Sequence, residues 1–155
     1  MTIASLVRAL PEGDRLLLDT TALAAYLDAT EATHGLAKHV VDVMVGTGRN
    51  PAIVSMITVM EILVRPLRAT PPGHHTVLAF IRGQPHLSAV PVDLQVAQDA
   101  ASLRAAQRFS PPDALIVGTA FAAQVGHLVT NDHGWARKLV GLESRIRVCT
   151  LSSHL

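Results

Sequence analysis

Four acidic residues have positions in the chain where chemistry could be done. Asp19 comes at once after the short apolar run 16–18, and Glu61 and Asp132 closely follow later apolar runs. The fourth, Asp113, lies in a Ser-Pro-Pro-Asp segment that opens a helical pattern. If these carboxylates converge they repel one another, and a hard divalent cation with oxygen ligands, Mg²⁺ or Mn²⁺, compensates their charge. Such an ion can generate hydroxide from bound water and stabilise charge on a phosphoryl oxygen.

Each acid also has a purely local explanation. Asp19 and Asp132 suit the N-cap position of a helix, where a short acidic side chain accepts backbone hydrogen bonds. The segments 58–61 and 110–113 both match the capping box, Ser or Thr followed three residues later by an acid. Caps occur at either edge of a sheet, so capping alone does not require the four acids to meet.

Position favours a shared site over four separate caps. In parallel sheets ligands bind outside the carboxyl ends of the strands, and Asp19, Glu61 and Asp132 all follow expected strands. Glu61 also lies in a mostly apolar helix, where an isolated ionised carboxylate is costly unless it is paired. Its local ion-pair partner is Arg65, one helical turn further on.

The elements that must position these acids alternate along the chain. Short apolar runs are typical of buried parallel strands, and the stretches between them have the 3.6-residue period of helices. This alternation predicts an α/β fold with a parallel sheet covered on both faces. The expected strands are 16–18, 52–57, 87–90, 127–129 and 146–149; the clearest helices are 36–45, 58–67, 94–107, 111–124 and 135–139; loops are expected at 46–51 and 69–75.

Length and composition bound the function. We expect the 155 residues to form one domain, 1–155, in which residues 1–14 precede the first strand as an N-terminal extension. No apolar stretch is long enough for a membrane span and no secretory signal is evident, so we expect a cytoplasmic protein. The net charge is +1 and aromatic residues make up 3%, which argues against nucleic-acid binding by charge or base stacking alone.

At this point the motifs resemble a known family, the PIN-domain ribonucleases, most closely the VapC-type toxins of bacterial toxin–antitoxin pairs. The resemblance runs from about residue 16 to residue 149, and Trp135 stands where Phe is more usual. No single motif is specific, but PPDALI followed by VTND is much stronger than D-T-T alone. The matching segments are LLLDTTAL with Asp19, ITVMEILVRP with Glu61, FSPPDALIVGTA with Asp113 and LVTNDHGW with Asp132.

The resemblance implies a three-layer α/β/α domain with a mostly parallel five-stranded sheet. It implies Mg²⁺-dependent hydrolysis of RNA, with Mn²⁺ as the alternative ion. It also suggests a homodimer and an antitoxin that covers the acidic groove. The metal-binding and catalytic acids would be Asp19, Glu61, Asp113 and Asp132, and the residues that orient them would be Thr20, Thr130 and Asn131.

Two other functions compete with this interpretation. A Mg²⁺-dependent phosphotransfer domain would use Asp19 as its nucleophile, but Thr21 stands where the second acid of a D-x-D motif should be. A non-catalytic PIN-like module that binds RNA or protein would keep the fold without the reaction, and motifs do not distinguish it.

The remaining polar residues carry weaker signals. The histidines have no metal-ligand spacing, and His133 is the one beside an acid. Cys149, the single cysteine, suits an inert core thiol. Four basic residues near the acids can contact phosphates or form solvated helix faces: Arg65, Arg68, Arg137 and Lys138.

Overall fold

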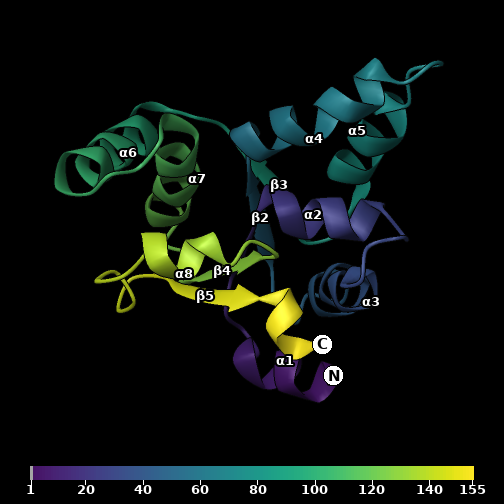
Figure 1. Ribbon diagram of the computed structural model, residues 1–155, viewed down its shortest axis with the longest axis horizontal. Helices are drawn as coiled ribbons and strands as arrows, with labels where there is room; N and C mark the ends of the chain where they lie inside the picture. Colours follow the sequence, from purple (N-terminus) through teal and green to yellow (C-terminus); the bar gives the residue numbers. More distant parts are fainter. Residues whose placement is uncertain (1) are drawn as a thin grey trace.

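A computed structural model describes residues 2–155 and contains one five-stranded sheet (Figure 1). The strand order is β3-β2-β1-β4-β5, and all four neighbouring pairs are parallel. The expected three-layer α/β/α fold is therefore confirmed, with a wholly parallel sheet. The strands are β1 (Leu16–Leu18), β2 (Ala52–Ser55), β3 (Leu87–Val90), β4 (His127–Thr130) and β5 (Arg147–Thr150).

The first strand separates two apolar cores because successive side chains of a strand point to opposite faces. Leu16 and Leu18 contribute to one core and Leu17 to the other, and all three are buried. The first core is covered by α1 (Ile3–Ala9), α2 (Thr20–Leu27), α3 (His34–Lys38), the π-helix η1 (His39–Val45), α4 (Met56–Arg68) and α5 (His74–Gly83).

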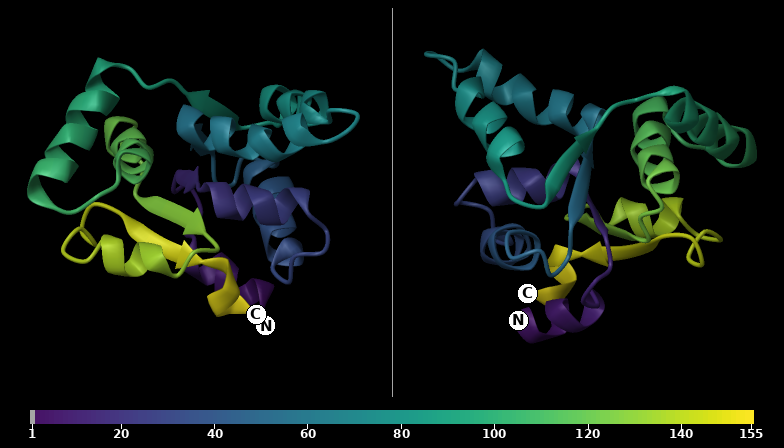
Figure 2. Two further views of the ribbon diagram at one scale, coloured as in Figure 1. Left: turned by 45° about the horizontal axis from the view of Figure 1, so that its top comes forward. Right: turned by 180° about the vertical axis from the view of Figure 1, so that it is seen from behind.

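The opposite face is covered by three helices that form a separate lobe of the molecule (Figures 1 and 2). They are α6 (Leu94–Ala106), α7 (Pro111–Ala122) and α8 (Gly134–Lys138). The first two, α6 and α7, pack closely at Gly118. A Cβ atom on this residue would lie only 3.0 Å from backbone atoms of both Val96 and Ala100. This lobe places Asp113 at the start of α7 and carries α8 directly after Asp132.

The second strand is shorter than its apolar run predicts. It ends at Ser55, whose Oγ accepts a hydrogen bond of 3.1 Å from the backbone N–H of Ile57 and so caps α4. Thr58 consequently lies inside this helix and is buried, so the expected capping box at residues 58–61 is wrong. The box at residues 110–113 begins as expected, since Ser110 caps α7 and accepts from the backbone N–H of Asp113.

The N-terminal extension is part of the folded structure. Within it α1 packs beside the C-terminal 3₁₀-helix η2 (Leu151–His154), and Leu6 and Leu10 are fully buried in the first core. The expected helix 36–45 divides into α3 and η1. The expected loop 69–75 ends earlier, at Gly73, because α5 begins at His74. No helix within residues 2–155 is long and apolar enough to cross a membrane.

Candidate active site at the carboxyl edge of the sheet

Asp19 is the most buried of the four acids, with 3% of its surface exposed. It occupies the N-cap position of α2, but its side chain makes no capping hydrogen bond. Instead Oδ2 accepts from three donors: the Thr130 hydroxyl at 2.9 Å, the Thr21 hydroxyl at 3.0 Å and the Trp135 indole N–H at 3.2 Å. Oδ1 makes no hydrogen bond within the described residues, so one carboxylate oxygen is fixed and the other stays available.

Thr130, the last residue of β4, links this acid to Asp132. Its hydroxyl donates to Asp19 and accepts the backbone N–H of Asp132 at 3.0 Å. The Thr21 hydroxyl lies 3.0 Å from the same hydroxyl and accepts the backbone N–H of Asn131 at 2.8 Å. A buried hydroxyl at a strand end thus ties two neighbouring strands and both acids into one polar network.

Asp132 adopts its position through the residue that begins α8. Its Oδ1 accepts the backbone N–H of Gly134 at 2.7 Å. A Cβ atom at Gly134 would lie 3.0 Å from that same oxygen, closer than ordinary contact. The absence of a side chain at this glycine therefore leaves the carboxylate the space that it occupies.

Glu61 reaches the site from α4 through Thr20. The Thr20 hydroxyl donates to Glu61 Oε2 and also lies 3.3 Å from the buried Thr58 hydroxyl. Thr20 follows Asp19 in the chain, so this contact ties Glu61 to the residue next to Asp19. The local partner expected for Glu61 is wrong, because Arg65 pairs instead with Asp28 at 3.5 Å.

Asp113 and Asp132 share one cation of the protein itself. The Lys138 ammonium lies 2.9 Å from Asp113 Oδ2 and 3.9 Å from Asp132 Oδ2. The two side chains come from different segments, α7 and the loop after β4, and converge although both carry negative charge. A cation between two ionised carboxylates offsets the repulsion between them.

The donor set is suited to a hard divalent ion, although the acids do not form a ready-made cage. Among residues 2–155 no three carboxylate, imidazole or thiol groups lie close enough together to hold a metal ion. Asp113 and Asp132 nevertheless already converge on a cation, and the Asn131 side-chain oxygen is buried without a hydrogen-bond partner in the described part of the chain. All these groups offer oxygen, which Mg²⁺ and Mn²⁺ prefer.

Three contributors to this network were not predicted to hold the acids. Thr21 and Trp135 hold Asp19, and Lys138 joins the other two aspartates. The tryptophan was visible in the sequence as an aromatic residue after the T-N-D motif. Its hydrogen bond was not, because only the fold brings it next to a residue more than a hundred positions earlier.

The single cysteine and the histidine beside the acids lie outside the network. The His133 ring nitrogen Nε2 lies 2.8 Å from the Ser152 hydroxyl, so this nitrogen already has a hydrogen-bond partner. Burial raises the pKa of the Cys149 thiol to about 11, so the thiol stays protonated at neutral pH. Both observations agree with a site built from oxygen ligands.

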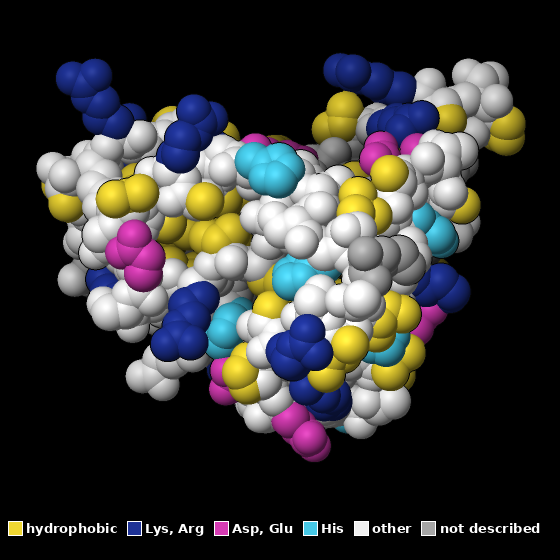
Figure 3. Space-filling model, turned by 60° about the horizontal axis from the view of Figure 1, so that its bottom comes forward, with side chains coloured by type: hydrophobic (Ala, Val, Ile, Leu, Met, Phe, Trp, Pro, Cys, Tyr) yellow, Lys and Arg dark blue, Asp and Glu magenta, His cyan; other side chains and the backbone are white. Residues whose placement is uncertain are grey.

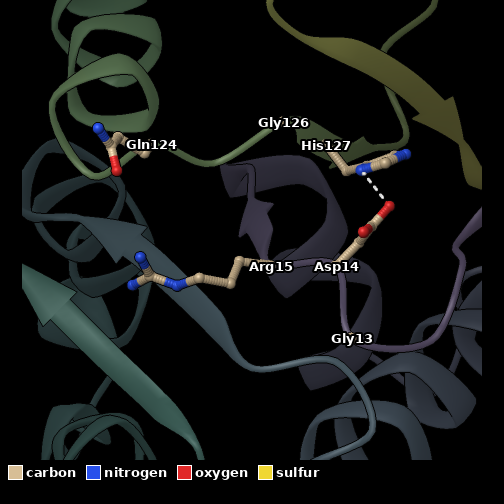
Figure 4. Close-up of a pocket in the computed structure, with 6 residues that line it drawn as sticks. All are labelled: Gly13, Asp14, Arg15, Gln124, Gly126 and His127. Atoms are coloured by element: carbon tan, nitrogen blue, oxygen red, sulfur yellow. Dashed lines mark ion pairs between the residues drawn. The ribbon is translucent and has the colours of Figure 1, made fainter.

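A hollow of about 310 Å³ lies at the opposite, amino edge of the sheet (Figure 4). His127, the first residue of β4, contacts Asp14 across it, with 3.4 Å between Nδ1 and Oδ2. Burial lowers the His127 pKa below its usual 6.5; nearby Arg147 lowers it further and Asp14 opposes both. The hollow is lined by Gly13, Asp14, Arg15, Gln124, Gly126 and His127, and contains none of the four predicted acids.

Structures of known proteins share this architecture. A toxin–antitoxin complex from Klebsiella pneumoniae matches with a TM-score of 0.63 and 20% identity, covering 88% of this chain and 97% of that one. FitAcB from Neisseria gonorrhoeae matches with a TM-score of 0.66 and 20% identity, covering 90% and 99%. VapC20 of Mycobacterium tuberculosis, a sarcin–ricin loop cleaving toxin, matches with a TM-score of 0.60 and 19% identity, covering 79% and 93%.

The parallel sheet with helices on both faces defines a class, that of three-layer α/β/α proteins. The family model of the PIN domain matches residues 16–139, which is most of the chain. The protein belongs to the PIN-domain family, and the resemblance expected from its motifs is confirmed. No curated protein sequence matches it significantly.

Proposed function

We propose that this protein is a Mg²⁺-dependent endoribonuclease that hydrolyses RNA phosphodiester bonds and acts as the toxin of a toxin–antitoxin pair. The observation that carries the proposal is the pattern of hydrogen bonds to the Asp19 carboxylate. Three donors fix one oxygen of this buried carboxylate and none occupies the other within the described residues. Orienting hydrogen bonds of this kind are typical of carboxylates that bind metal ions.

In the proposed site Asp19 and Asp113, together with Glu61 and Asp132, would hold Mg²⁺ or Mn²⁺. When bound, such an ion activates water and stabilises charge on a phosphoryl oxygen. The residues of the chain itself would bind and orient. Thr130 and Thr20, which contact Asp19 and Glu61, would position these acids, and Asn131 would act indirectly through its backbone N–H to Thr21. No protein group is required as general base.

The substrate and the partner are inferred from relatives. VapC20 is described as cleaving the sarcin–ricin loop, and other similar structures are toxin–antitoxin complexes. On the face in Figure 3, Lys and Arg side chains are dispersed among acidic, histidine and apolar ones. With a net charge of only +1, the RNA would be held locally at the carboxyl edge, where an antitoxin would also block it.

The proposed biological unit is a cytoplasmic homodimer of one-domain chains, residues 1–155. The buried contacts of α1 with the first core support including the N-terminal extension in that domain. Bound antitoxin would cover the acidic groove and restrain cleavage.

The test is cleavage of structured and single-stranded RNA by the purified protein with Mg²⁺, with EDTA, and with Asp19→Asn. We expect Mg²⁺-dependent cleavage that EDTA abolishes and that Asp19→Asn lowers by about a hundredfold or more. The matched control is Glu12→Gln, because Glu12 is an exposed acid far from the carboxyl edge. Absence of cleavage with any metal, together with no metal binding by titration, would refute the enzyme and leave a binding module.

A further inference from the structure

The Lys138 side chain suggests that the acidic site contains its own counter-cation. We propose that the Lys138 ammonium holds the Asp113–Asp132 pair together and competes with a divalent ion for these two carboxylates. The inference rests on the proposed function, since it concerns the same acids. It makes Lys138 a positioning residue that sets how tightly the site binds metal.

The contacts of Lys138 support this role more strongly than its sequence position does. Its Nζ atom lies between two acids, 2.9 Å from Asp113 Oδ2 and 3.9 Å from Asp132 Oδ2. These oxygens belong to residues 19 positions apart in the chain, so the ammonium links the start of α7 to the loop after β4. A divalent ion that bound the same oxygens would have to displace the ammonium.

Trp135 holds the lysine in this place. The Lys138 ammonium lies 4.8 Å from the centre of the Trp135 indole ring, within range of a cation–π interaction. Trp135 precedes Lys138 by about one turn of α8. The ring itself is fixed, because Trp135 is 2% exposed and its N–H donates to Asp19. One indole thus orients an acid through its edge and a cation through its face.

The neighbouring Arg137 provides a matched comparison on the same helix. It is exposed and forms no ion pair with an acid among residues 2–155, although it carries the same charge. Neutralising either residue changes the net charge equally. A local role predicts an effect from Lys138 alone, whereas a general charge effect predicts similar changes from both.

The decisive experiment is calorimetric titration of Mn²⁺, without RNA, into the wild-type protein and the variants Lys138→Met, Lys138→Arg and Arg137→Met. We expect Lys138→Met to bind Mn²⁺ roughly tenfold more tightly, since it removes the competing charge. Lys138→Arg, which keeps the charge, and Arg137→Met should stay within about twofold of the wild type. Damage to the fold would weaken binding, so tighter binding is not explained by a merely structural role.

Thermal unfolding gives a second readout. Without metal, Lys138→Met should unfold at a lower temperature than Arg137→Met, because the two aspartates then repel without a cation between them; Mn²⁺ should remove the difference. Equal Mn²⁺ affinity in wild type and Lys138→Met, or weaker binding in the variant, would overturn the role of Lys138 and leave the nuclease proposal standing. Undetectable Mn²⁺ binding in every protein would overturn the proposed metal site and this inference with it.

Discussion

The two edges of the sheet use buried polar residues in opposite ways. At the carboxyl edge Asp19 is held by three side-chain donors, and hydroxyl groups link it to the loop that carries Asp132. At the amino edge His127 meets one acid, Asp14, across an open hollow (Figure 4). The same two strands, β1 and β4, therefore carry a cross-linked network at one end. At the other end the polar contacts are separate, between His127 and Asp14 and between Arg15 and the Ala123 carbonyl.

This difference agrees with the proposal that the carboxyl edge is the active site. In the described part of the chain, the network gives one oxygen of the Asp19 carboxylate three donors and the other oxygen none. The amino edge has a hollow of about 310 Å³, and none of the four predicted acids lines it. The candidate site is therefore identified by the bonding of its polar groups and not by the presence of a hollow.

Among the variants that test this comparison of the two edges, the largest effect is expected from removing the hydroxyl that both acids use. Thr130→Val deletes the donor to Asp19 and the acceptor of the Asp132 backbone N–H while keeping the shape of the side chain. We expect metal affinity and cleavage to fall about 10- to 100-fold, as for other residues that orient metal ligands. Calorimetry with Mn²⁺ and RNA cleavage rates measure the two quantities.

The control for this variant is Thr119→Val in α7. Thr119 is equally buried, but its hydroxyl donates to the Leu115 carbonyl and contacts none of the four acids. It should lose a similar amount of stability, about 1 kcal/mol, and keep its metal affinity. Equal loss of metal affinity in both variants would show that the hydroxyl of Thr130 matters for packing alone.

An intermediate effect is expected at Gly134. Gly134→Ala places a Cβ atom 3.0 Å from Asp132 Oδ1, so the carboxylate must move by a few tenths of an ångström. Cleavage should fall about tenfold, since small misplacements of reacting groups are costly. At the amino edge Gly126→Ala, where a Cβ atom meets nothing within 4 Å, should leave cleavage unchanged; a loss there instead would reverse the assignment of the two edges.

The smallest effect concerns pH at the amino edge. Because the His127 pKa is lowered in the folded protein, protons bind the unfolded chain more readily. The stability that neutral His127 contributes is complete above its unfolded pKa of about 6.5 and is lost as pH falls through the lowered folded value. Urea unfolding at pH 7.5 and 5 should show a smaller pH dependence for His127→Gln; an unchanged dependence would assign the effect to other groups.

The sequence predicts the sheet because its strands are short segments rich in apolar residues. Each run is mostly apolar, with polar Ser88 and Arg147 in the two edge strands, and all five lie within a few residues of the expected positions. The errors arise where two local signals overlap. Ser55 ends a strand and caps a helix at once, so apolar Met56 and Ile57 belong to α4 although they continue the run.

The candidate site is only partly visible in the sequence, for a different reason. Asp19 and Asp132 follow strands, and their proximity could be predicted because carboxyl ends of neighbouring parallel strands meet. The contact of Lys138 with the acids has no such signal, since basic residues are common in the last turn of a helix. Its contact with Asp113 depends on the angle at which α7 and α8 pack, which is a property of the tertiary structure.

The indole of Trp135 has a practical consequence for every experiment above. It is the single tryptophan of the chain, and it contacts both Asp19 and Lys138. Its emission therefore comes from one place, and that place is the candidate site. Binding of an ion, a nucleotide or an inhibitory protein there should change the fluorescence of the unmodified molecule, which carries its own optical reporter.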